Sequence, residues 1–303
     1  MGKKKSGLGS SLLLLLAAFI WGIAFVAQSV GMEYMGPCTF NGVRFLIGSA
    51  VLVPFILFRD RHADQTQRSA GDKKNLLTGG ICCGVALCAA SLFQQMGILY
   101  TTVGKAGFIT TLYIIIVPIL GIFMKKKIGG RVWIGAMIAV VGMYLLCVTE
   151  SFSISRGDFL VLICAVLFSG HILVVDHFSP RTDSVKLSCM QFLVSGIICS
   201  VMAFLFEEPS LAAILSGIVP VLYAGVLSCG VAYTLQVVGQ KKVEPTVASM
   251  ILSMESVFSV LAGWLLLGQR LSGKELWGCV LVFAAVILVQ LPSAADQSAT
   301  LEK

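Results

Sequence analysis

The sequence predicts an all-α integral membrane protein with ten transmembrane helices, arranged as two inverted five-helix repeats. The first observation is composition: of 303 residues, 57% are hydrophobic and 12% charged, whereas soluble domains carry about 25% charged residues. The second is that apolar runs of about 20 residues, the length that crosses a bilayer, recur along the chain. The third is an internal repeat. One soluble core could not bury this much apolar surface.

The first apolar run follows Lys3, Lys4 and Lys5 and looks at first like a signal peptide. Its apolar part is about 20 residues long and lacks an A-x-A cleavage pattern, so we expect a retained first helix. Nine further runs of spanning length follow, at 39–58, 76–97, 106–124, 132–148, 158–175, 187–206, 211–237, 245–267 and 276–291. The run from 211 is overlong, which predicts a kink at Pro220 or an interfacial start.

The distribution of Lys and Arg predicts the orientation. With the N-terminus inside, seventeen of these residues fall on the inner side and four on the outer side, and Arg44 lies within the second span. The positive-inside rule therefore places both termini in the cytoplasm, and we expect the plasma (inner) membrane. Segment 59–75 is the only sizeable hydrophilic connection, so no part of the chain predicts a soluble catalytic domain, and we expect no enzyme.

The internal repeat divides the chain into two halves. A shift of about 147 residues aligns Trp21-Gly22 with Phe168-Ser169, and Arg44-Phe45 with Gln191-Phe192. Five spans in each half give the halves opposite orientations, and inverted repeats are typical of secondary transporters with a substrate site near the midplane. We therefore expect repeats at 1–149 and 150–292, a short cytoplasmic tail at 293–303, and a monomer as the functional unit.

Four segments resemble the EamA-type branch of the drug/metabolite transporter superfamily: FIWGIAFV, GVRFLIGS, QQMGILYTTVGKAGFITTLYIIIVPILG and ILSMESVFSVLAGWLLLGQRLSGKELWG. The resemblance covers essentially the whole chain. It implies ten helices around a central cavity and secondary transport of small organic metabolites. We expect export of amino acids or related solutes by alternating access. The chain departs from the family at Glu255-Ser256, where Glu-Pro is common, and so lacks the proline that favours the family's usual helix break.

Glu255 lies near the middle of the apolar stretch 244–270. An ionised side chain at a helix centre costs roughly 2.5 to 3.5 kcal/mol, so such residues usually face a wet cavity or a partner. Glu255 could carry a proton for coupled transport, or it could be a structural carboxyl bonded to neighbouring helices. His171 is the second coupling candidate, with substrate contact or a bond to a backbone carbonyl as its alternatives.

Arg44 has three possible roles: snorkelling to the outer interface, capping a helix, or binding an anionic group of the substrate. Other polar residues lie in spans expected to line the cavity, although interhelical hydrogen bonds are their ordinary role. The candidate substrate-binding residues are Trp21, Gln28, Arg44, Gln94, Gln95, Tyr113, His171, Tyr233, Gln236 and Glu255.

Several classes of protein find no support in the sequence. Nearly all ten cysteines lie in apolar runs without zinc-ligand spacing, so we expect no metal site and no cofactor. The basic clusters fit membrane orientation rather than nucleic-acid binding. The expected partners are a small-molecule substrate and the lipid bilayer. An intramembrane enzyme, a lipid-handling protein and a passive solute channel remain as alternatives.

Overall fold

The computed structural model describes residues 7–62, 70–101, 103–124, 128–147, 155–267 and 272–290, and every regular element in these ranges is a helix. Eight helical segments there are long and apolar enough to cross a membrane: Leu8–Gly31, Pro37–Arg61, Lys73–Ile98, Val103–Phe123, Arg156–Arg181, Ser184–Phe206, Ile218–Gln240 and Pro245–Leu266. Two shorter apolar helices, Gly130–Leu145 and Leu276–Val289, overlap the other two predicted spans. The multi-pass membrane class is confirmed, and ten crossings remain a prediction.

The first half of the chain contains α1 (Leu8–Gly31), α2 (Pro37–His62), α3 (Ala70–Ile98), α4 (Val103–Thr110), α5 (Tyr113–Phe123) and α6 (Gly130–Cys147). The helices α4 and α5 share one apolar span, which is interrupted at Thr111 and Leu112. The basic residues at 3–5 and 125–127 and the tail at 293–303 lie outside the described residues.

The second half contains α7 (Arg156–Phe178), η2 (Ser179–Arg181), α8 (Ser184–Phe206), α9 (Leu211–Ser216), α10 (Ile218–Leu222), η3 (Tyr223–Tyr233), α11 (Thr234–Gln240), α12 (Pro245–Leu252), α13 (Met254–Leu267) and α14 (Gly273–Gln290). The overlong apolar run from 211 thus divides into the short helix α9 and a following span that begins at Ile218. In that span, α10 and α11 flank η3, a π-helix.

The span that carries Glu255 is also interrupted, at Ser253, although no proline follows the glutamate. Serine hydroxyls compete for the backbone carbonyls at this point. The Ser253 hydroxyl donates to the Met250 carbonyl at 2.7 Å, and the Ser256 hydroxyl donates to the Ser253 carbonyl at 2.8 Å. The Ser256 amide also reaches the Ser253 carbonyl, at 3.1 Å, which is the tighter 3₁₀ spacing. The break therefore forms without the family's proline.

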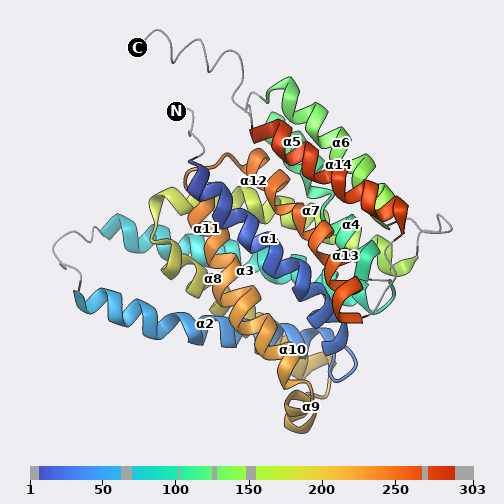
Figure 1. The fold of residues 1–303 in the computed structure, drawn as a ribbon. Coiled ribbons are helices and arrows are strands. Elements are labelled where there is room, and N and C mark those ends of the chain that lie inside the picture. The colour runs from blue at the N-terminus through green and yellow to red at the C-terminus, as the bar shows by residue number, and fades with distance from the viewer. Residues whose placement is uncertain are drawn as a thin grey trace.

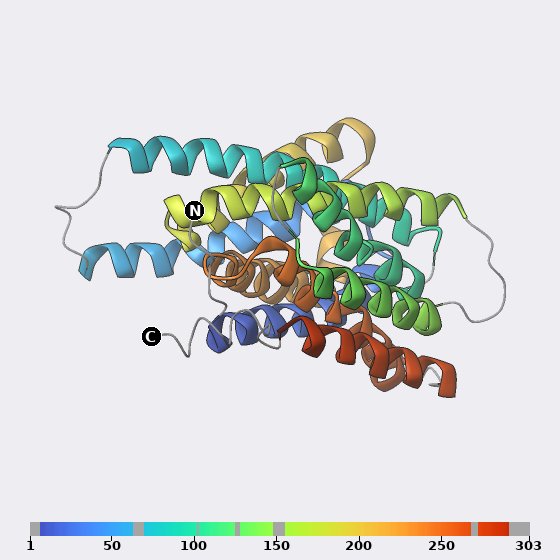
Figure 2. The ribbon, with the colours of Figure 1, turned by 90° about the horizontal axis from the view of Figure 1, so that it is seen from above.

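Helices at matching positions of the two halves pack against each other. The helix α2 packs against α8, and α6 packs against α14. Similarly, α1 contacts α13 and η3, while α7 contacts α4, α5 and α3. Figures 1 and 2 show α1 beginning and α14 ending on the same side of the bundle. A chain that crosses the membrane an even number of times has both of its ends on the same side.

Small residues bring several of these helices together. A Cβ atom at Gly22 of α1 would lie 2.4 Å from the Cβ of Phe258 in α13, and one at Gly142 of α6 would lie 2.8 Å from the Gly278 carbonyl oxygen in α14. Close approach through small residues is the usual way in which helices associate in membranes. Gly142 and Gly278 therefore allow close packing of α6 against α14.

The pair α2 and α8 is tied together at both ends. At one end, both Glu207 carboxylate oxygens accept hydrogen bonds at the start of α2: from the Cys38 amide at 2.7 Å, and from the Thr39 amide and hydroxyl at 2.8 and 2.6 Å. A carboxylate is favourable there because the N-terminus of a helix is electropositive. At the other end, Arg59 pairs with Asp183 at 2.6 Å, and Lys186 pairs with Asp60 at 2.7 Å.

Candidate functional site

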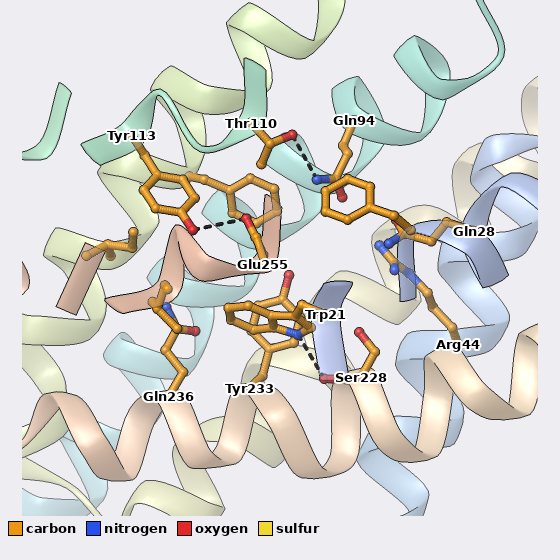
Figure 3. Close-up of a pocket in the computed structure, with 14 residues that line it drawn as sticks. Trp21, Gln28, Arg44, Gln94, Thr110, Tyr113, Ser228, Tyr233, Gln236 and Glu255 are labelled. Atoms are coloured by element: carbon orange, nitrogen blue, oxygen red, sulfur yellow. Dashed lines mark hydrogen bonds between the residues drawn. The ribbon is translucent and has the colours of Figure 1, made fainter. Parts of the chain in front are cut away.

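A pocket with an empty volume of about 470 Å³ lies among helices of both halves (Figure 3). It is lined by Trp21, Phe25, Gln28, Arg44, Gln94, Thr110, Tyr113, Phe168, Ile172, Ser228, Tyr233, Gln236, Leu252 and Glu255. Aromatic and aliphatic groups are combined with a few polar side chains, which is the usual composition of a small-molecule site.

Glu255 and Tyr113 meet at the two interrupted spans. Tyr113 is the first residue of α5, Glu255 is the second residue of α13, and the Tyr113 hydroxyl donates to Glu255 Oε1 at 3.0 Å. Both side chains are buried. Each break brings the N-terminus of a half-helix to the pocket, and such N-termini favour negative charge. The Glu255 carboxyl therefore lies in a site suited to hold it inside the membrane.

Arg44 is buried in the bundle, with only 1% of its surface exposed, and does not reach the outer interface. Its guanidinium carbon lies 4.8 Å from the centre of the Phe45 ring and 5.6 Å from that of Phe40. Neither Nε nor Nη2 has a hydrogen-bond partner among the described residues. Ring faces attract a cation, yet they leave its hydrogen-bond donors unused. The snorkelling alternative is therefore wrong.

Trp21 and Tyr233 pack together on one wall of the pocket. Their ring centres are 4.6 Å apart, and the Trp21 indole nitrogen donates to the Ser228 carbonyl at 3.3 Å. Both Ser228 and Tyr233 belong to the π-helix η3. π-Helical turns are rare in proteins as a whole, but those that do occur are often found at functional sites. The first and second halves of the chain are thus joined directly at the pocket.

Gln94 and Gln28 complete the polar lining near Arg44. The Gln94 amide nitrogen approaches the Thr110 hydroxyl at 3.3 Å, linking α3 to α4. The Gln28 side-chain oxygen is buried and has no partner among the described residues. The pocket therefore presents unused acceptors as well as the unused donors of Arg44.

The structure brings together eight of the ten candidate residues around this pocket; Gln95 and His171 lie outside it. The Gln95 amide nitrogen donates to the Gln28 backbone carbonyl at 3.1 Å, holding α3 against α1. His171 Nε2 bonds to the Gln191 side-chain oxygen at 3.0 Å. Both residues make the interhelical hydrogen bonds that polar groups ordinarily make in membranes. Substrate contact by any of the ten residues remains a prediction.

Sequence reasoning missed six lining residues: Phe25, Thr110, Phe168, Ile172, Ser228 and Leu252. Four of them are apolar residues inside apolar spans, which carry no distinguishing signal. For Thr110 and Ser228, the spacing from a predicted site residue was a signal that could have been used. Thr110 precedes Tyr113 by three residues, and Ser228 precedes Gln236 by eight, spacings that bring residues to a similar face of a helix. Within the described residues, no cluster of His, Cys, Asp and Glu could hold a metal ion.

Comparisons with known proteins address the family directly. The model of the EamA-like transporter family matches residues 8–148 and 155–291. An uncharacterized transporter of Archaeoglobus fulgidus is 30% identical over 279 residues, covering 92% of this chain and 84% of the relative. A chloroplastic WAT1-related protein of Arabidopsis thaliana is 21% identical over 300 residues, covering 94% and 70%. A crystal structure shares the fold, with a TM-score of 0.77, 19% identity and coverage of 93% and 96%. The chain belongs to the EamA-like transporter family.

Proposed function

We propose that this protein is a secondary active transporter that exports small organic metabolites, amino acids or related solutes, across the plasma membrane. The observation that carries the proposal is the pocket, which is built from both halves of the chain inside a multi-pass helical bundle. Substrate sites of secondary transporters lie between two repeats near the bilayer midplane. The relatives are named transporters, which favours this class over an enzyme.

Alternating access is the transport mechanism that fits this arrangement. If the chain crosses the membrane ten times, its two five-helix halves have opposite orientations. Movement of one half against the other would then expose the pocket first to one side of the membrane and then to the other. The matching pairs α2 with α8 and α6 with α14 support such a relation. The breaks at Thr111 and Ser253 occupy equivalent spans beside the pocket, and interrupted helices typically form the substrate sites of such transporters.

Proton coupling through Glu255 is part of the proposal. Glu255 lines the pocket and bonds to Tyr113, so a change in its protonation state would directly alter the site. His171 is the second candidate, although it bonds to Gln191 outside the pocket lining. A proton-coupled exporter would release a proton inward for each cycle of outward solute movement.

The proposal is tested with purified protein in liposomes, by measuring solute flux with and without an imposed pH gradient. We expect accumulation against a solute gradient that collapses when a protonophore is added. Flux that only dissipates a gradient would indicate a channel, and a chemically altered solute would indicate an enzyme.

Mass measurement in detergent, combined with activity of each fraction, should find the active species to be a monomer with one pocket per chain.

A further inference from the structure

The polar groups of the pocket are separated into two ends. In Figure 3, Arg44 and Gln28 lie on one side of Trp21 and Tyr233, Tyr113 and Gln236 lie on the other, and Glu255 lies above the two rings, bonded to Tyr113. A cationic side chain and a carboxyl thus face the same pocket without pairing: none of the salt bridges among the described residues joins Arg44 to Glu255. The arrangement resembles a receptor with two charged ends and an apolar middle.

The Arg44 end lacks an anion. Its Nε and Nη2 atoms are buried without partners, and the rings of Phe40 and Phe45 flank the guanidinium group. A buried guanidinium with unused donors is costly unless a partner completes it. A carboxylate suits it best, because its two oxygens match the fork of Arg donors.

The Glu255 end is rich in hydrogen-bond acceptors. The Tyr113 hydroxyl donates to Oε1 of Glu255 at 3.0 Å, and the carboxyl itself lines the pocket. The side-chain oxygen of Gln236, which also lines the pocket, is buried and unpartnered. An ammonium group carries three donors and no acceptor, so it would serve both groups at once.

The middle of the pocket is apolar and aromatic. Trp21 and Tyr233 lie between the two ends, and Phe25, Phe168 and Leu252 complete the lining. Such surfaces favour hydrocarbon and the faces of aromatic rings rather than hydroxyl-rich groups. A ligand that fills the pocket therefore needs its charges at its ends and methylene or aromatic groups between them.

We propose that the pocket recognises a zwitterion whose carboxylate and ammonium groups are separated by an apolar segment, with the carboxylate on Arg44 and the ammonium on Glu255. This inference rests on the proposed function and narrows its substrate class. Carboxylic acids that carry an amine at the other end of a hydrocarbon chain fit this description. Dianions are disfavoured by Glu255, and dications by Arg44.

The experiment uses a series of unbranched ω-amino acids, from glycine to 7-aminoheptanoate, which differ only in the distance between the carboxylate and the ammonium group. Binding to the purified full-length protein is measured by calorimetry and by thermal shift, and flux is measured in liposomes. We expect an affinity optimum at an intermediate length. At that length, amidation of the carboxylate or acetylation of the amine should weaken binding at least tenfold.

Matched variants assign each end. In Arg44→Gln, the optimal compound and its amide should bind equally weakly, whereas Arg44→Lys should retain part of the preference for the carboxylate. In Glu255→Gln, acetylation of the amine should lose its effect while amidation keeps it. Arg59→Gln, on the same helix but outside the pocket lining, and Glu244→Gln, which changes an exposed residue, are the controls and should show the wild-type preferences for the carboxylate and the amine.

The outcomes separate the inference from the function on which it rests. Equal binding of the zwitterion, its amide and its acetyl derivative to wild type would overturn the two-ended recognition, as would affinity that is independent of chain length. If liposomes then still accumulated another metabolite, the transporter function would stand without it. If binding showed an affinity optimum at an intermediate chain length but no solute crossed the bilayer, the recognition would stand and the transport proposal would fail.

Discussion

Replacement of Glu255 by Gln separates a proton carrier from a structural carboxyl. The amide keeps the shape of the side chain and an oxygen that accepts from the Tyr113 hydroxyl, now 3.0 Å from Oε1, but it cannot titrate. If Glu255 carries the coupling proton, accumulation driven by a pH gradient should be abolished, while exchange of solute across the membrane continues at saturating solute concentration. The thermal stability should fall only modestly, because a neutral hydrogen bond of about 0.5 to 1.5 kcal/mol replaces one to a charged group, of about 1.5 to 3 kcal/mol.

Tyr113→Phe is the matched perturbation from the other side of the same bond. It leaves the proton site intact but removes the donor to Oε1, so the buried carboxyl loses its partner at a cost of about 1 to 3 kcal/mol. We expect a lower melting temperature with coupling retained. Both variants are compared in accumulation, exchange and thermal unfolding assays on the same preparations. Accumulation that still depends on the pH gradient in Glu255→Gln would refute the carrier role and leave His171 as the next candidate.

Three further predictions concern the ends of the helices. Impermeant thiol reagents should label a cysteine placed at Glu208 from outside and one placed at Arg181 from the cytoplasm, and the reverse pattern would contradict the orientation. Glu207→Ala should destabilise the protein by about 1.5 to 3 kcal/mol, because two amides at the start of α2 lose their carboxylate partner; unchanged thermal unfolding would contradict this account. Burial favours the neutral acid at Asp183, but hydrogen bonds from Arg59 and the Lys186 amide, with their charges, hold the pKa of Asp183 below its ordinary value of 3.8. Its contribution to stability is therefore present above about pH 4 and is lost as the pH falls through the lowered pKa, so Asp183→Asn should flatten the acid side of a melting-temperature profile.

The apolar runs predicted the spans well because length and composition alone decide whether a helix can cross a bilayer. Arg44 and Glu255 were found for a related reason: a charge inside a span is costly, so it points to a cavity or a partner. The overlong run from 211, for which a kink at Pro220 or an interfacial start was expected, divides at Gly217 into α9 and the span that begins at Ile218.

Sequence could not assign faces within the spans. A helix that is apolar all round gives no periodic signal for the side that meets the pocket, so Gln94 and Gln95 were equally good candidates although only Gln94 lines it. His171 looked like a cavity residue, yet it bonds to Gln191 of a neighbouring helix, a partner that depends on tertiary packing. The break at Ser253 was missed because serine side chains, rather than a proline, produce it.

Substrate-protected labelling of Ser228→Cys tests most directly whether solute passes through this pocket. The variant is made in a background without the native cysteines and reacted with an impermeant maleimide from each side of the membrane in turn. The account predicts that the thiol reacts from both sides, because the pocket opens alternately, and that a transported solute slows the reaction from either side. Labelling that proceeds from one side only, or at an equal rate with and without saturating solute, would contradict it.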